Sequence, residues 1–128
     1  MNAMPSAAMR MATILCIDDE TAALAIRKRV LESAGYRVSA ARSAEEGIRL
    51  FRSEAFDLVI CDYWMPSMNG IATARELKRF NPSVPVLILS GLSPLPDEMI
   101  GVADRWILKD EGPEFLLHAI NSLLKPAS

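Results

Sequence analysis

The stretch DLVICDYWMPSMNG, residues 57–70, joins an apolar run to a loop that is punctuated by proline and glycine. The run LVIC is continuously apolar, as in a parallel strand whose two faces are both covered by helices. Asp62 follows this run directly, and a carboxylate at the end of a buried strand is costly unless a partner or a ligand offsets its charge. The stretch therefore predicts a buried parallel strand that ends in a candidate functional carboxylate.

The same alternation continues in both directions along the chain. Short apolar runs typical of strands alternate with longer segments whose apolar residues have helical spacing. The predicted strands are residues 13–18, 36–41, 57–62, 84–90 and 105–109, and the predicted helices are residues 21–35, 43–54, 69–79, 97–102 and a last helix that starts at 112–113. This repeated order predicts a single α/β domain in which helices cover both faces of one parallel sheet.

Local signals mark several helix ends. Ser43 and Glu46 form the S-x-x-E pattern that caps a helix start, Asn69 is a second capping residue, and Pro113 suits the first turn of the last helix. Gly35 is a stop signal for the first helix. The residues predicted to face the core are Leu24, Val30, Leu31 and Ala34 in the first helix, Ile71, Ala74 and Leu77 in the third, and Phe115, Leu116, Ile120 and Leu123 in the last.

The bulk composition restricts the class of protein. A chain of 128 residues, 51% hydrophobic and 23% charged, is typical of one soluble globular domain. The net charge of −2 provides no basic field for direct binding to nucleic acid or to a membrane surface, and no apolar run approaches the length of a membrane-spanning helix. Residues 1–12 lack the apolar centre of a secretory signal. We expect them to be a flexible tail that precedes a cytoplasmic domain at residues 13–126.

Cysteine and histidine usage narrows the chemistry. Cys16 and Cys61 lie inside apolar runs, which favours buried, reduced thiols over the alternatives of a disulfide or a redox role. Two cysteines without neighbouring histidines make a poor zinc site. His118 is the single histidine, which excludes histidine metal clusters and disfavours a Ser-His-Asp triad.

Polar residues gather where the predicted strands end. Asp18 ends the first predicted strand and Asp19 comes directly after it. Asp62 ends the third strand, Ser90 the fourth and Lys109 the fifth. Ligands of open parallel sheets bind at this edge, and three converging aspartates repel one another unless a divalent cation such as Mg²⁺ joins them. A lysine and a hydroxyl on the far side complete a site that accepts a phosphoryl group, which a carboxylate attacks.

Each of these residues also has a simpler explanation. Adjacent aspartates at a helix start are often capping residues that favour the helix dipole. Lys109 alone would be a solvated surface lysine, and Ser90-Gly91 an ordinary turn. Their joint occurrence at four strand ends favours the functional interpretation.

The chain from Thr13 to Lys125 resembles the receiver domain of two-component response regulators. The matching stretches are CIDDE, CDYWMPSMNG, LILSG and WILKD, and the pattern D-x-x-M-P-x-M-N-G is the most specific of them. The resemblance implies a flavodoxin-like, doubly wound fold with five parallel strands in the order 2-1-3-4-5.

The resemblance also implies a site and its partners. Asp62 would be the phosphoacceptor, taking a phosphoryl group from a histidine kinase or a histidine phosphotransfer protein. The chain would catalyse its own phosphorylation and dephosphorylation without being a classical enzyme, and would regulate an output domain or effector, with phosphorylation-dependent dimerisation as an option. The implied catalytic residues are Asp62, Ser90 and Lys109, and the implied Mg²⁺ ligands are Asp19, Asp62 and the backbone carbonyl of Trp64, with Asp18 acting through a water.

Three features depart from the family pattern. The family has a proline joined by a cis bond after the conserved lysine, whereas Asp110 follows Lys109 here; a cis bond to a non-proline residue costs about 2.5–4 kcal/mol, so we expect a trans bond and an altered loop that affects the reach of the lysine. Pro94 and Pro96 shorten the fourth predicted helix. Trp106 occupies the aromatic position of the fifth strand that is usually tyrosine or phenylalanine.

Two other functions stay open at this level. A degenerate receiver would act as a phosphorylation-independent interaction module, which the altered region after Lys109 favours and the complete set of site residues disfavours. A free-standing phosphotransferase or hydrolase would need a general base and a substrate-binding cap, and the sequence shows neither. Because the chain ends just after its last predicted helix, we expect either a stand-alone receiver or part of a longer regulator.

Overall fold

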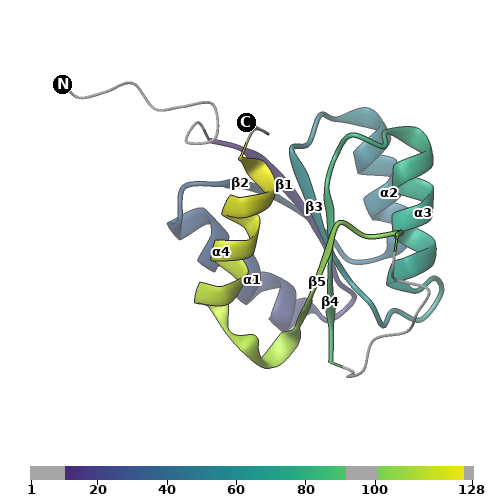
Figure 1. Cartoon of the computed structure of the whole chain (residues 1–128). Coiled ribbons are helices and arrows are strands. Elements are labelled where there is room, and N and C mark those ends of the chain that lie inside the picture. Colours follow the sequence, from purple (N-terminus) through teal and green to yellow (C-terminus); the bar gives the residue numbers. More distant parts are fainter. Residues whose placement is uncertain (1–10, 92–100, 126–128) are drawn as a thin grey trace.

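The computed structural model describes residues 11–91 and 101–125 of the chain. Five strands form one parallel sheet in the order β2-β1-β3-β4-β5, which confirms the predicted fold (Figure 1). The elements in chain order are β1 (Thr13–Ile17), α1 (Thr21–Ser33), β2 (Arg37–Ala41), α2 (Ala44–Ser53), β3 (Leu58–Asp62), α3 (Gly70–Phe80), β4 (Val86–Ser90), β5 (Arg105–Leu108), a short 3-10 helix (Lys109–Glu111) and α4 (Pro113–Leu124).

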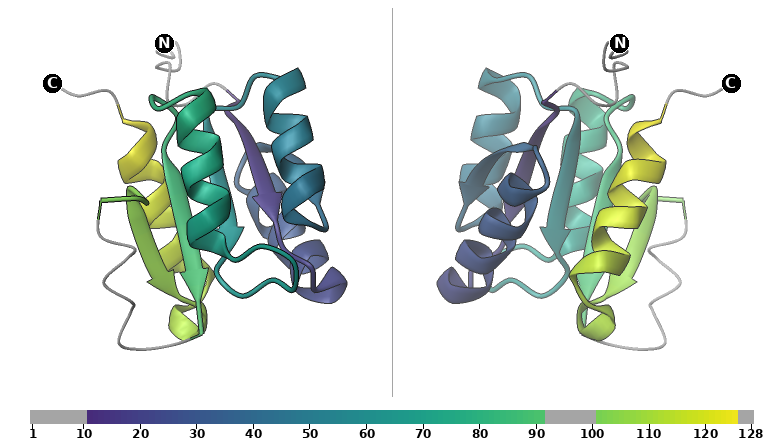
Figure 2. Two further views of the ribbon diagram at one scale, coloured as in Figure 1. Left: turned by 90° about the vertical axis from the view of Figure 1, so that its right-hand side faces the viewer. Right: turned by 90° about the vertical axis from the view of Figure 1, so that its left-hand side faces the viewer.

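Helices cover the sheet on both faces. Figure 2 shows α2 and α3 in front of the sheet in one view, and α1 and α4 in front of it in the other. Successive strand residues point to opposite faces, so β1 and β3 feed two separate cores. Leu15, Ile17 and Val59 belong to the core under α2 and α3, whereas Ile14 and Ile60 belong to the core under α1 and α4.

The two cysteines lie on opposite faces of the sheet. Cys16 belongs to the core under α1 and α4 and Cys61 to the core under α2 and α3, and both are buried, free thiols as predicted. Burial raises the pKa of Cys16 to about 12 and also raises the pKa of Cys61. The thiols are therefore protonated at neutral pH and act as small core residues.

The helix-start signals on the α2/α3 face are confirmed. Ser43 Oγ accepts a hydrogen bond from the Glu46 backbone N–H at 3.0 Å, and Asn69 Oδ1 accepts one from the Ala72 backbone N–H at 2.9 Å. The Glu46 carboxylate accepts from the backbone N–H of Arg42 at 2.8 Å, one residue before the position expected for a capping box. The start of α2 is thus held from both sides.

Two predicted core positions are wrong. Ala34 is exposed because α1 ends at Ser33 and the chain turns through Gly35, whose φ of 101° suits glycine. Phe115 lies in the first turn of α4 with 40% of its surface exposed, and Arg105 stacks over its ring at 5.9 Å. The other predicted inward residues are buried or half-buried.

Some sequence predictions concern residues outside the described ranges. Residues 1–10 of the predicted tail are among them, as are Pro94, Pro96 and most of the helix predicted at residues 97–102. Within that helix, Gly101 and Val102 lie in a turn. None of the described helices has the length and apolar character needed to cross a bilayer.

Candidate functional site

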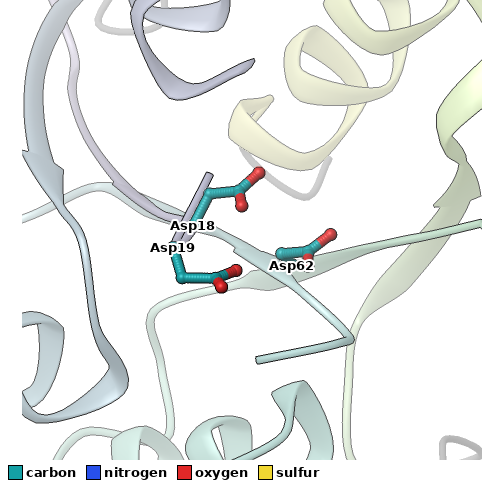
Figure 3. A group of neighbouring side chains, drawn as sticks. All are labelled: Asp18, Asp19 and Asp62. Atoms are coloured by element: carbon teal, nitrogen blue, oxygen red, sulfur yellow. The ribbon is translucent and has the colours of Figure 1, made fainter. Parts of the chain in front are cut away.

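The strand order brings the predicted aspartates together. β1 and β3 are neighbours and Ile17 pairs with Cys61, so the residues that follow these two lie side by side at the carboxyl edge of the sheet. Ligand oxygens of Asp18, Asp19 and Asp62 all lie within 4.8 Å of one another, and Figure 3 shows the three side chains adjacent at the ends of β1 and β3. Asp18 is fully buried and Asp62 is 3% exposed, whereas Asp19 is exposed.

Asp18 is held in place by its neighbours on three sides. Its backbone N–H donates to the Ala41 carbonyl at 3.0 Å. Its Oδ1 accepts from the Glu20 backbone N–H at 3.0 Å, and its Oδ2 accepts from Arg27 Nη1 at 3.1 Å. A buried carboxylate with these donors has a fixed orientation.

Lys109 reaches the aspartates from the end of β5. Its Nζ lies 2.6 Å from Asp62 Oδ1 and 3.9 Å from Asp18 Oδ2. The residues that follow it form a short 3-10 helix, Lys109–Glu111, in the region where the sequence departs from the family pattern. The altered loop therefore leaves the reach of the lysine intact.

The pKa of Asp62 lies above the ordinary aspartate value. Burial raises its pKa above the ordinary aspartate value, the hydrogen bond from Lys109 opposes that rise, and the nearby charge of Asp18 adds to it. Since the net effect is a raised pKa, ionised Asp62 is under-compensated in its pocket. A group that brings positive charge to this carboxylate is favoured.

Gly70 allows the loop after Asp62 to fold back on the strand. A Cβ at this position would lie 2.7 Å from the Asp62 carbonyl oxygen and 2.8 Å from Tyr63 Cα. The Gly70 N–H donates to the Tyr63 carbonyl at 2.7 Å. The glycine of the quoted stretch is thus required by a close approach of two backbone segments, a reason that the sequence alone does not reveal.

The acidic residues open into a pocket of about 350 Å³. Trp64, 74% exposed, stands at this pocket. Ser90, 1% exposed, lies at the end of β4, between β3 and β5. The pocket is lined by Asp18, Asp19, Glu20, Asp62, Trp64, Pro66 and Lys109.

The donor set fits a hard divalent cation. Three carboxylates face two cationic side chains, Lys109 and Arg27, so the group keeps a net negative charge. Carboxylate oxygens beside an open, hydrated pocket suit Mg²⁺, which prefers oxygen ligands and retains several waters. Asp19 is exposed to that pocket and is the most accessible of the three for such an ion.

Arg27 is the site residue that sequence reasoning missed. It lies three residues after Leu24 and four before Leu31, both of which are buried on the inner side of α1. An arginine on the inner stripe of an amphipathic helix is a sequence signal for a buried partner. The sequence alone does not identify that partner as Asp18.

Comparison with known proteins agrees with this geometry. The family model for the response regulator receiver domain matches residues 14–121. The transcriptional regulatory protein ZraR of Klebsiella oxytoca is 42% identical over 80 residues, covering 62% of this chain and 18% of ZraR. The probable transcriptional regulator ycf27 of Porphyridium aerugineum is 34% identical over 120 residues, covering 91% of this chain and 50% of that protein. The chain thus spans half or less of these two relatives.

Solved structures show the same fold. A response regulator receiver domain protein from Clostridium thermocellum superposes with a TM-score of 0.82 at 35% identity, covering 88% of this chain and 94% of that one. The response regulator protein TrrA from Thermotoga maritima, in complex with Mg²⁺-BeF, superposes with a TM-score of 0.84 at 28% identity, covering 89% of this chain and 100% of that one. Together with the match over residues 14–121, these likenesses establish that the chain belongs to the response regulator receiver domain family.

Proposed function

We propose that this receiver domain accepts a phosphoryl group on Asp62 and that the modified state carries a signal to an output. The observation that carries the proposal is the pairing of a buried, under-compensated Asp62 with Lys109 at 2.6 Å. Asp18 and Asp19 lie beside this pair within one open pocket.

The donor that fits this chemistry is a phosphohistidine on a histidine kinase or a histidine phosphotransfer protein. An Asp62 carboxylate oxygen forms the new P–O bond while the P–N bond of the donor breaks. The released imidazole takes up a proton. Burial raises the pKa of Asp62, so the ionised carboxylate is favoured when its negative charge is shared with the transferred phosphoryl group. The chain's own part is to present the nucleophile and to place positive charge on the transferred oxygens.

The other site residues take complementary roles in this proposal. Lys109 moves from the Asp62 carboxylate to a phosphoryl oxygen, and the Ser90 hydroxyl, at the neighbouring strand end, donates to another. Asp19, Asp62 and the Trp64 carbonyl would hold Mg²⁺, with Asp18 acting through a water. The bound ion would supply positive charge for the phosphoryl oxygens.

The output is reached through protein contacts. The relatives ZraR and ycf27 are named as transcriptional regulators, and this chain matches 18% and 50% of their lengths. With a net charge of −2, we infer that this domain controls an effector rather than binding nucleic acid itself. Phosphorylation-dependent dimerisation is one route, and light scattering with and without phosphodonor would detect it.

Intact-mass spectrometry after incubation with acetyl phosphate and Mg²⁺ tests the proposal. We expect a single phosphoryl adduct that is absent in Asp62→Asn and Asp62→Ala, because Asp18 is tied to Arg27 and Glu20. An adduct at full yield in both variants would place the acceptor elsewhere. No adduct in the wild-type chain, with any phosphodonor and with a histidine phosphotransfer protein, would instead support a phosphorylation-independent interaction module.

A further inference from the structure

Arg27 is a mostly buried cation beside the acidic pocket. Its side chain is 11% exposed, and its Nη1 lies 3.1 Å from Asp18 Oδ2 on a side chain that is 1% exposed. Placing an arginine on the inner side of α1 is costly unless a partner offsets its charge. Asp18 is that partner, and the pair joins α1 to the carboxyl end of β1.

Each of the two cations of the site lies close to a different aspartate: Lys109 to Asp62 and Arg27 to Asp18. Lys109 lies 2.6 Å from Asp62 but 3.9 Å from Asp18. Arg27 is therefore the cation closer to Asp18, and it donates a hydrogen bond to Asp18 Oδ2. The Glu20 backbone N–H donates to Asp18 Oδ1. Within the described residues, Asp19 makes no ion pair.

Arg27 does not line the acidic pocket. It lines a second pocket of about 350 Å³ between α1 and α4, together with Ile107 and Leu116. The two pockets adjoin, because Glu20 and Lys109 line both of them. The guanidinium can thus remain paired to Asp18 while the other side of the aspartate cluster binds a cation. Its charge then acts on any ion that the aspartates hold, because its Nη1 lies 3.1 Å from Asp18 Oδ2.

We propose that Arg27 is a built-in counter-ion of the acidic pocket, which holds Asp18 in place when no metal is bound and lowers the affinity of the pocket for Mg²⁺. The inference rests on the proposed function, since it concerns the same ion. Removing the charge of Arg27 leaves the aspartates less compensated. The metal-free domain becomes less stable, and Mg²⁺ binds more tightly because one competing positive charge is gone.

The test measures Mg²⁺ affinity and melting temperature, without any phosphorylation step. Arg27→Gln removes the charge and keeps an amide donor, Arg27→Met removes both, and Arg27→Lys keeps the charge. Arg29→Gln is the matched control, since Arg29 is an exposed arginine of the same helix. A Trp106→Phe background leaves Trp64, an exposed residue that lines the acidic pocket, as the single tryptophan reporter for the titration.

We expect the two neutral variants to melt at lower temperature in EDTA and to gain more from saturating Mg²⁺ than the wild type does. Ligand binding stabilises the folded state by mass action, so tighter binding appears as a larger gain at equal Mg²⁺ concentration. The Mg²⁺ dissociation constant should fall by roughly three- to tenfold in both. Arg27→Lys and Arg29→Gln should stay within about twofold of the wild type.

An unchanged or weaker Mg²⁺ affinity in Arg27→Gln and Arg27→Met would overturn the inference. Arg27 would then be a structural residue whose loss lowers the melting temperature equally with and without the metal. Asp19→Asn separates this failure from a failure of the proposed site. Wild-type binding that Asp19→Asn suppresses upholds the site whatever Arg27 does, whereas no Asp19-dependent binding overturns the site and the inference together.

Discussion

The two ends of the sheet each carry a lysine–aspartate ion pair of the same length. At the carboxyl end Lys109 Nζ lies 2.6 Å from Asp62, and at the amino end Lys78 Nζ lies 2.6 Å from Asp104. By distance alone the pairs are equivalent. Their surroundings give them opposite roles.

The amino-end pair completes a local set of hydrogen bonds. Lys78 Nζ also donates to the Val84 carbonyl at 2.9 Å and to the Pro82 carbonyl at 3.3 Å. Asp104 in turn accepts from the Val86 backbone N–H at 2.7 Å, at the start of β4. Every charge there is matched by a nearby partner, which is the arrangement of a structural link.

The carboxyl-end pair leaves charge uncompensated. Asp62 is 3% exposed and lies beside Asp18, and its pKa is raised by burial in spite of the lysine. A raised carboxylate pKa means that the ionised form costs the folded protein stability. The environment of an ion pair, rather than its length, therefore separates a satisfied structural pair from one that leaves an aspartate under-compensated.

The largest difference should appear in the rate of phosphorylation. Lys109→Met removes the cation that we propose to neutralise the phosphoryl oxygens, and loss of one such group costs about 10²-fold in rate. Lys78→Met should leave the rate within about twofold, because its charge lies at the other end of the sheet. Adduct formation with acetyl phosphate, followed by intact mass, measures both; equal rates in the two variants would erase the functional distinction.

The stability effect of Lys78→Met should come next in size. This change removes the cation that Asp104 and two backbone carbonyls share and leaves Asp104 with the hydrogen bond from the Val86 N–H. We expect a cost of about 1–2 kcal/mol in the free energy of unfolding. The control is Lys125→Met, at an exposed lysine just after α4, which should change this free energy by less than about 0.5 kcal/mol. Urea unfolding in EDTA gives both values, and equal losses would show that the amino-end pair is not a structural link.

At pH 7 without metal, Asp62→Asn and Asp104→Asn should change the stability of the fold in opposite directions. Folding raises the Asp62 pKa above its unfolded value, so the folded state holds that proton more tightly and stability falls as pH rises through the folded pKa. Asp62→Asn removes this penalty and should raise the melting temperature. Asp104→Asn weakens a satisfied pair and should cost about 1 kcal/mol.

The pH dependence gives this prediction its control. As pH falls below the raised pKa of Asp62, the wild-type carboxylate becomes protonated, and the advantage of Asp62→Asn over the wild type should shrink. Melting curves at pH 7 and near pH 4 in EDTA provide the comparison. A destabilised Asp62→Asn at pH 7 would mean that Lys109 fully compensates the carboxylate.

The residues at the carboxyl end of the sheet can be predicted from the sequence, whereas the ion pair at the amino end cannot. Strand-end residues such as Asp18, Asp62 and Lys109 follow apolar runs, and parallel strands place their ends at one edge. The five-strand order followed from the receiver resemblance and is confirmed by the pairing of the strands. Lys78 and Asp104 lie on separate segments and share no motif, so only their three-dimensional arrangement reveals the pair.

The remaining misses have local physical causes. Arg27 and Gly70 are defined by what approaches them from other segments, Asp18 in one case and the Asp62 carbonyl in the other. Helical spacing predicts that Ala34 and Phe115 face the core. Both lie at helix ends, where the periodic pattern no longer determines which side faces the core. Periodicity therefore predicts the middles of elements better than their ends.

The smallest predicted effect concerns the half-life of the proposed phosphoryl adduct on Asp62. Hydrolysis of an acyl phosphate needs a water in line with the phosphorus. The resemblance to receiver domains implies that the side chains two positions after the proposed acceptor and two after Ser90 border that approach. These positions are Trp64, which lines the acidic pocket, and Leu92, which lies outside the described residues. The Trp64 indole N–H can donate but not accept a hydrogen bond, so it cannot orient a water for attack.

Trp64→Asn should therefore shorten the half-life of the adduct severalfold, because the amide oxygen can accept a hydrogen bond from the attacking water. We expect a change of less than a factor of ten in rate, which is about 1.4 kcal/mol of activation free energy. Mg²⁺ affinity should be unaltered, since the proposed ligand at this position is the backbone carbonyl.

Phe80→Asn, at an exposed aromatic residue that ends α3, is the control and should leave the half-life unchanged. Following loss of the adduct mass after removal of the phosphodonor measures each half-life. Equal half-lives in Trp64→Asn and the wild type would show that the indole lies beside the pocket without controlling the approach of water.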